Sequence, residues 1–294
     1  MIYDIRLRLT HFYSGPVGFG RHRVRVVPLD IPTWQRVLSW TLEGDPVPSE
    51  QLDERDFFEN HSSFLLHNAP HAQMQIRMAA RVERLVQQLK QDTSPTIIGL
   101  AAEIASLRDL SPASPHHFLG RSERITMPVD LTRYARTQAA STSSSWAAVQ
   151  LLGKALHRDM RFDGSATTVD TPLEEAFHHR HGVCQDFAHI MIAGLRSLGI
   201  PARYVSGFLR TEPPEGQARL EGADAMHAWV SAWCGARMGW VEYDPTNGII
   251  VGTDHVTVGY GRDYFDVSPI KGVLRSSGQS SVAQAVDVIP VVAY

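Results

Sequence analysis

The sequence predicts a mixed α+β protein in which a β-rich domain precedes a domain of helices and antiparallel strands. Near the start of the chain, apolar residues alternate with polar ones at a period close to two, which is typical of half-buried strands. From about residue 95 they recur at helical spacing instead, and strand-like segments return after residue 201. A hydrophobic content of 43% with 20% charged residues indicates a folded globular chain.

The first domain is expected to span residues 1–88. Residues 2–27 are predicted to form a strand, a turn at Ser14-Gly15-Pro16 and a second strand, because glycine and proline separate two alternating runs. Residues 34–42 are predicted to form a third strand, and residues 74–85 favour a strand over a short helix. A block of this length has the ordinary size of a domain.

A helical and loop connector is expected over residues 89–144, ahead of a second domain over residues 145–294. The clearest element of the connector is a helix between Pro95 and Leu110, with Ser94 or Thr96 as a candidate start signal. The elements expected in the second domain are helices over 146–160, over 172–179 and from Cys184, and strands over 202–209, 227–233 and 240–243.

Charge and composition argue against several classes of partner. The chain carries 28 Lys and Arg against 31 Asp and Glu, which gives neither the basic surface of a nucleic-acid-binding protein nor a polybasic membrane anchor. Its start has no apolar signal-peptide core, and no apolar run approaches the roughly 20 residues that cross a bilayer. We therefore expect a cytoplasmic protein without nucleic-acid or membrane partners.

The two cysteines, Cys184 and Cys234, are too few for a disulfide framework and are expected to differ in role. Cys184 opens a predicted helix, whose N-terminal partial positive charge favours the thiolate, a nucleophile. Its backbone N–H, unpaired in the first turn, could help to hold an oxyanion. The alternative is a buried structural cysteine, the commoner role. Cys234 lies beside a turn with no base near it in sequence, and is predicted to be structural or incidental.

His227 and Asp244 are the candidate base and its orienting carboxylate. His227 begins one predicted strand and Asp244 ends the next, with a turn over residues 235–239 between them. Antiparallel pairing of these strands places the start of one beside the end of the other, so the two side chains are expected to meet. Together with Cys184 they would form a nucleophile–base–orienter triad. Taken singly, a strand-edge histidine and an Asp-Pro turn are the more ordinary interpretations.

Three segments resemble, in the same order, the motifs of bacterial transglutaminase-like proteins. Residues 182–189 (GVCQDFAH), followed by 195–207 (LRSLGIPARYVSG), resemble the Cys motif. Residues 224–230 (DAMHAWV) resemble the His motif, and residues 240–248 (WVEYDPTNG) resemble the Asp motif. The N-terminal block is similar to the β-rich domain that precedes the core in these proteins, although residue 59 is Glu where Gly is expected.

The resemblance implies a papain-like core over residues 145–294, in which the Cys helix packs on an antiparallel sheet that carries His227 and Asp244. It also implies acyl transfer on protein or peptide amides through a thioester on Cys184. Hydrolysis by a protease or amidase is expected over cross-linking by a transglutaminase. A catalytically silent binding module on the same fold is the alternative. No cofactor is expected, and the oligomeric state is not predicted.

Other residues near these motifs have weaker signals. Asp186, in the first turn of the Cys helix, is predicted to act as a cap, and its neighbour Gln185 is a candidate substrate contact. Trp229 is predicted to shield the His227 imidazole or contact substrate, or to serve sheet packing alone.

The histidines at positions 178, 179 and 181 suggest a metal site, but zinc needs three or four converging ligands and adjacent histidines on a helix point apart. We expect no metal there.

Overall fold

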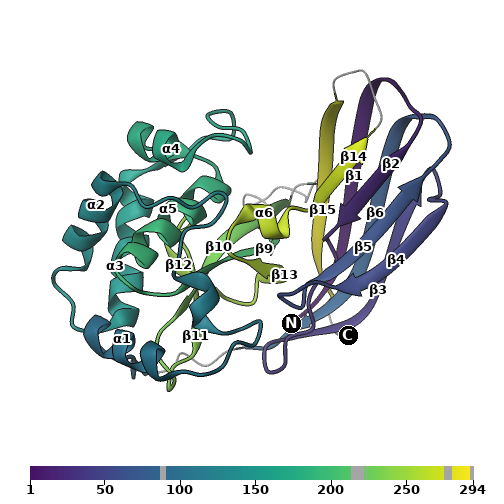
Figure 1. Cartoon of the computed structure of the whole chain (residues 1–294). Helices are drawn as coiled ribbons and strands as arrows, with labels where there is room; N and C mark the ends of the chain where they lie inside the picture. Colours follow the sequence, from purple (N-terminus) through teal and green to yellow (C-terminus); the bar gives the residue numbers. More distant parts are fainter. Residues whose placement is uncertain (87–90, 213–221, 223, 275–279, 292–294) are drawn as a thin grey trace.

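The computed structural model describes residues 1–86, 91–212, 222, 224–274 and 280–291, and it confirms the mixed α+β fold. Figure 1 shows a two-sheet β-sandwich on one side and, on the other, helices covering one face of a separate five-stranded sheet. None of the helices in the described ranges is long and apolar enough to span a bilayer.

The sandwich consists of two four-stranded antiparallel sheets with orders β15-β1-β6-β3 and β14-β2-β5-β4. Its strands are β1 (Ile2–Val17), β2 (Gly20–Val24), β3 (Gln35–Asp45), β4 (Glu50–Arg55), β5 (His61–His67), β6 (His71–Arg84), β14 (Ile270–Leu274) and β15 (Ser280–Val291). The β-rich N-terminal block is thus present, with two strands, β4 and β5, that the sequence did not predict. The expected turn at residues 14–16 falls inside β1, where the pairing with β6 is irregular between Phe12 and Val17.

The domain boundaries expected from the sequence differ from those of the structure. β15 pairs with β1 from Tyr13↔Ser280 to Ile2↔Val291, and β14 pairs with β2, so the C-terminal segment belongs to the sandwich. The second domain therefore does not extend to residue 294. At its other end, Leu100, Ile104 and Leu131 are buried in the core of the second domain, which makes the supposed connector part of that domain.

The second domain has a five-stranded antiparallel sheet of order β12-β11-β10-β9-β13. Its strands are β9 (Ala202–Leu209), β10 (Ala225–Trp233), β11 (Trp240–Asp244), β12 (Ile249–Ile250) and β13 (His255–Gly261). The helices are α1 (Ile97–Ser106), α2 (Val129–Ala139), α3 (Ser145–Asp159), α4 (Leu173–His179), α5 (Cys184–Ser197), α6 (Tyr264–Val267) and the 3₁₀ turn η1 (Pro115–Phe118). A parallel pair, β7 (Arg161–Phe162) and β8 (His181–Gly182), precedes α5.

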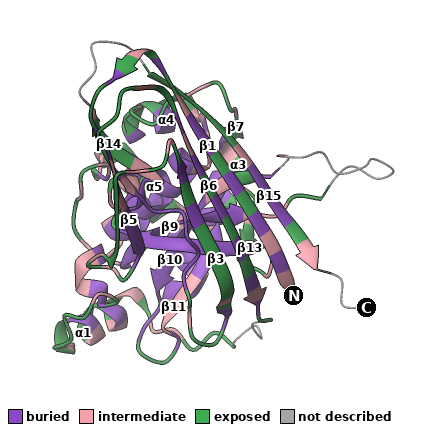
Figure 2. Ribbon diagram, turned by 90° about the vertical axis from the view of Figure 1, so that its right-hand side faces the viewer, coloured by how far each residue is buried: buried purple, intermediate pink, exposed green. Residues whose placement is uncertain are grey.

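Helix α5 is the centre of the second domain. Every residue from Gln185 to Arg196 is buried, and the helix contacts β9 and β10 on one side and α2, α3 and α4 on the other. Figure 2 shows α5, β9 and β10 almost entirely in the buried colour. A helix that is enclosed on all sides is a rigid support for the residue at its first position, Cys184.

The opposite face of this sheet is covered by the N-terminal domain. Trp34 packs against Val205 and Trp229 in a shared buried cluster. Gln35 donates from Nε2 to the carbonyl of Thr257 at 2.7 Å and accepts from the Thr257 N–H at 2.8 Å. Asn60 makes the same two-way contact with the backbone of Tyr260. Edge strand β13 is therefore held in place by side-chain amides of the other domain.

We predict that Gly153→Ala destabilises the protein. A Cβ at Gly153 in α3 would lie 2.1 Å from the ring of Tyr243 in β11, so the helix would have to move away from the sheet. Overpacking of this kind costs about 1–3 kcal/mol, and it outweighs the gain of up to about 1 kcal/mol in helix propensity. The free energy of unfolding in urea measures the loss. Gly120→Ala is the control, since a Cβ there meets nothing within 4 Å. Equal stability of the two variants would contradict the close packing of α3 on β11.

Candidate active site

Contacts between Asp186 and the segment before α5 fix the position of Cys184 at the start of the helix. Asp186 accepts a hydrogen bond at its Oδ2 from the backbone N–H of Val183 at 2.8 Å, and from the Thr167 hydroxyl at 2.6 Å. A Cβ at Gly182 would lie 2.5 Å from the same oxygen, so a glycine is needed where the chain passes the cap. The cap predicted for Asp186 is confirmed, and burial raises the pKa of this carboxyl. Cys184 itself is partly buried.

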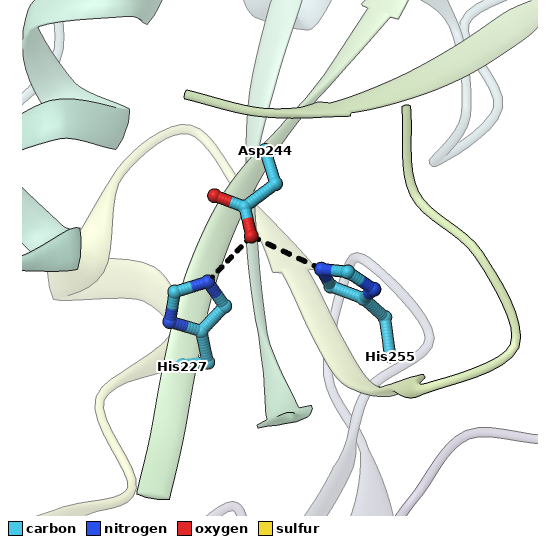
Figure 3. A group of neighbouring side chains, drawn as sticks. All are labelled: His227, Asp244 and His255. Atoms are coloured by element: carbon cyan, nitrogen blue, oxygen red, sulfur yellow. Dashed lines mark hydrogen bonds and ion pairs between the residues drawn. The ribbon is translucent and has the colours of Figure 1, made fainter. Parts of the chain in front are cut away.

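His227 and Asp244 meet as the strand pairing predicted. β10 and β11 are antiparallel, with Val230 opposite Tyr243 and Trp233 opposite Trp240. Nε2 of His227 lies 2.8 Å from Oδ2 of Asp244. Figure 3 shows this contact, with the second ring nitrogen of His227 turned away from the carboxylate.

Asp244 is the most heavily hydrogen-bonded carboxylate of the site, and it is fully buried. Its Oδ1 accepts from the backbone N–H groups of Thr246 and Asn247, at 2.9 and 3.2 Å. Its Oδ2 accepts from the side chain of Asn247 at 2.6 Å, in addition to His227. Burial alone would raise the pKa of Asp244, but the histidine hydrogen bonds outweigh burial and hold the pKa far below its usual range.

The same oxygen also contacts His255 on β13, which the sequence analysis did not single out. Nε2 of His255 lies 3.1 Å from Oδ2 of Asp244, and Figure 3 shows both imidazoles meeting one oxygen. Burial lowers the pKa of His255 in spite of this contact, so the ring is neutral and donates its Nε2–H. Neither spacing nor a motif marks His255, because β13 and β11, the strand of Asp244, are not neighbours in the sheet, and the contact forms only when the sheet is assembled.

Cys184 completes the group. Burial would lower the pKa of His227, yet its hydrogen bond with Asp244 and its contact with the Cys184 thiol raise that pKa to about 10. The imidazole is therefore protonated at neutral pH, with Asp244 on one side and the sulfur on the other. The structure thus brings together Cys184, His227 and Asp244, the three residues that the sequence analysis selected.

This geometry agrees with what the chain is similar to. Residues 132–245 match the transglutaminase-like superfamily, and residues 3–83 match the bacterial transglutaminase-like N-terminal region. An uncharacterised protein of Mycobacterium tuberculosis is 35% identical over 300 residues, covering 98% of this chain and 92% of that protein. The chain belongs to the bacterial transglutaminase-like family.

The chain is also similar to a solved structure and to a named enzyme. A candidate cysteine protease from Cytophaga hutchinsonii has the same fold, with a TM-score of 0.75 at 20% identity over 98% of this chain and 90% of that one. A protein-glutamine gamma-glutamyltransferase of Pseudomonas aeruginosa is 32% identical over 134 residues, which are 43% of this chain and 20% of that protein.

Trp229 supports the transglutaminase-like site from behind. Its indole N–H donates to Glu242 at 2.7 Å, and Glu242 also accepts from the Tyr260 hydroxyl at 3.0 Å. The indole ring lies 6.1 Å from the ring of His227 and 5.1 Å from that of His255, centroid to centroid. Trp229 shields the imidazoles; it is fully buried, and its contact with substrate stays a prediction.

The other candidates have local structural roles. Gln185 is buried and donates from Nε2 to the carbonyl of Val169 at 3.2 Å, which ties the preceding loop to α5, and its substrate contact stays a prediction. Cys234 is buried, and burial raises the pKa of its thiol, as suits a structural residue.

A metal ion does not fit the group of His227, Asp244 and His255, although three of its ligand atoms lie within 4.8 Å of one another. Oδ2 of Asp244 already accepts from both imidazoles and from the Asn247 amide, whose N–H points at the same oxygen. A cation there would face these donors. Within the described ranges no other group brings three such ligand atoms together, the histidines at 178, 179 and 181 included.

We predict that iodoacetamide labels Cys184 much faster than Cys234. Cys184 is partly exposed at a helix start beside the imidazole of His227, whose pKa is raised, whereas Cys234 is buried and the pKa of its thiol is raised by burial. Peptide mass spectrometry over time gives both rates, and His227→Gln should slow only the labelling of Cys184. Equal slow labelling of both thiols in the wild-type protein would contradict an activated Cys184.

We also predict a specific loss of stability at alkaline pH. The pKa of His227 is raised in the folded state from 6.5 to about 10, so the stabilisation is complete below pH 6.5 and disappears as the pH rises through 10. Across this window the free energy of unfolding should fall by up to about 1.4 kcal/mol per pH unit more in the wild-type protein than in His227→Gln. Parallel pH profiles for the two proteins would show that His227 is not held protonated.

Proposed function

We propose that this chain is a cysteine-dependent acyl-transfer enzyme that acts on amides of proteins or peptides, with water as the preferred acceptor. The observation that carries the proposal is the position of His227, which contacts the buried Asp244 carboxylate through Nε2 at 2.8 Å and also contacts the Cys184 thiol. An imidazolium beside a thiolate supplies a nucleophile and a general acid in one pair.

The first half of the proposed reaction forms a thioester. The Cys184 thiolate attacks the amide carbonyl carbon, and the carbonyl electron pair moves onto oxygen. The N–H of Cys184, in the first turn of α5, has no backbone acceptor among the described residues and is available to that oxyanion. As the tetrahedral intermediate collapses, the C–N bond breaks, and His227 gives its proton to the leaving amine.

The second half releases the product. Neutral His227 accepts a proton from water, and the resulting hydroxide equivalent attacks the thioester carbon. The C–S bond then breaks, which yields the carboxylic acid and returns Cys184 and His227 to their starting state. Asp244 keeps the imidazole in one orientation throughout, because its hydrogen bond fixes the position of Nε2.

The acceptor distinguishes hydrolysis from cross-linking. Transfer to an amine requires a site that binds the amine and excludes water, whereas hydrolysis needs only an accessible thioester. The partial exposure of Cys184 supports hydrolysis. The name of the Pseudomonas relative supports the alternative, transfer from a protein glutamine to an amine. A cytoplasmic location and the absence of nucleic-acid and membrane partners stay predictions.

A proteomic comparison tests this proposal. A protein mixture is treated with the wild-type chain, with Cys184→Ala and, as the matched control, with Cys234→Ala. New peptide termini report hydrolysis, and incorporation of a labelled primary amine reports transfer. We expect new termini from the wild type and Cys234→Ala, and at least about a thousandfold less from Cys184→Ala, because the nucleophile is lost. Incorporation without cleavage would assign transferase activity. No difference between the wild type and Cys184→Ala in either channel would favour a binding module.

A further inference from the structure

A pocket separate from the candidate active site lies where the two domains meet. It has a volume of about 480 Å³, within the range of small-ligand sites, which favour domain interfaces. One wall is the 29–34 segment of the N-terminal domain, and the floor is the face of the second-domain sheet opposite to α5. The floor and remaining walls include Phe58, Pro112, Ala113, Arg203, Trp240 and Tyr260.

Arg203 is the only cationic side chain among the residues that line this pocket. It is 8% exposed. Its Nε donates to the Ser231 hydroxyl at 3.2 Å, and its two Nη atoms have no hydrogen-bond partner among the described residues. The guanidinium carbon lies 4.2 Å from the ring centroid of Trp240 and 3.6 Å from that of Tyr260, so the plane is held between two aromatic rings.

The charge of Arg203 lacks a direct counter-ion. Glu242 is the nearby carboxylate and its charge favours that of Arg203, but its two oxygens accept from Trp229 and Tyr260, and no carboxylate of the described residues lies within ion-pair distance of Arg203. A buried charge is ordinarily paired, since isolation from water is costly. An aromatic clamp fixes the guanidinium and stabilises its charge without occupying the Nη donors.

We propose that this pocket binds a monocarboxylate with an apolar or aromatic body, whose carboxylate accepts from both Nη atoms of Arg203. A planar guanidinium presents two parallel donors that match the two oxygens of a carboxylate. The apolar walls fit the body of the ligand. Asp30 and Glu59 at the exposed rim disfavour a second negative charge. A free carboxylic acid and the C-terminal residue of a peptide share this chemistry.

The proposal does not depend on the proposed acyl transfer. Arg203 and Tyr204 are neighbours on β9, and they point to opposite faces of the sheet. Tyr204 packs in the core with α5, whereas Arg203 faces the N-terminal domain. Binding can therefore be measured in Cys184→Ala, with hydrolysis excluded.

The test uses a matched pair of ligands on the full chain carrying Cys184→Ala. N-acetyl-L-phenylalanine has the carboxylate, and N-acetyl-L-phenylalaninamide replaces it with a neutral amide of similar shape. By calorimetry we expect the acid to saturate one site at millimolar concentration, and the amide to bind at least about tenfold more weakly, because the charge-assisted hydrogen bonds are lost.

A peptide ending in phenylalanine distinguishes the two sources of such a carboxylate. Binding as tight as that of the acid assigns the site to peptide termini, and weaker binding of the peptide assigns it to free acids. Equal binding of acid and amide, or no binding of the acid, overturns the proposal.

Two variants locate the binding. Arg203→Gln removes the charge, and Ala113→Phe fills the pocket from an exposed position while it leaves Arg203 intact. Each should weaken the acid at least about tenfold, whereas Arg136→Gln, on the exposed surface of α2, should not. Unchanged binding in Ala113→Phe places the ligand elsewhere and contradicts the proposal, even if Arg203→Gln does not fold.

Discussion

The buried carboxylate of Asp244 is the constraint on which the site depends. It accepts hydrogen bonds from two backbone N–H groups, one amide and two imidazoles, and it is sealed from solvent. With that many donors the carboxylate stays ionised in spite of burial, and its charge keeps a proton on His227. The chemistry proposed at Cys184 draws on this anion, because Asp244, together with the contact to Cys184, offsets the burial that would otherwise leave the imidazole neutral.

The two domains cooperate in holding that anion. β13 carries His255 to Asp244, and β13 is an edge strand that needs a partner on its open side. Gln35 and Asn60 of the N-terminal domain supply that partner by pairing with the backbone of Thr257 and Tyr260. The C-terminal strand β15 closes the sandwich by returning to β1. The N-terminal domain therefore contributes to the candidate site through the position of β13, in addition to one wall of the Arg203 pocket.

The sequence predicted those parts of the site that local chemistry marks. A helix start marks Cys184, and two strands joined by a short turn mark His227 and Asp244. Both features can be recognised within a short stretch of sequence. β9 was predicted over its observed range, 202–209, since a run of apolar residues between turns has few alternatives. Strand β4 was missed because all six of its residues are exposed, which leaves no alternation to detect.

The other features that the sequence did not predict depend on pairing between segments far apart in the chain. Nothing local indicates that β15 pairs with β1, since the two strands lie at opposite ends of the chain. His255 and Glu242 escaped notice for a related reason, because each acquires its role from contacts between strands rather than from its neighbours in sequence. The aromatic clamp on Arg203 likewise joins β9, β11 and β13, which no motif connects.

The protonation state of His227 is the most direct test of this account. ¹⁵N NMR of the imidazole distinguishes a doubly protonated ring from either neutral tautomer. At pH 7.5 we expect both nitrogens of His227 to carry protons in the wild-type protein, and the ring to become neutral in Asp244→Asn. A neutral His227 ring in the wild-type protein at that pH would contradict the claim that buried Asp244 organises the site.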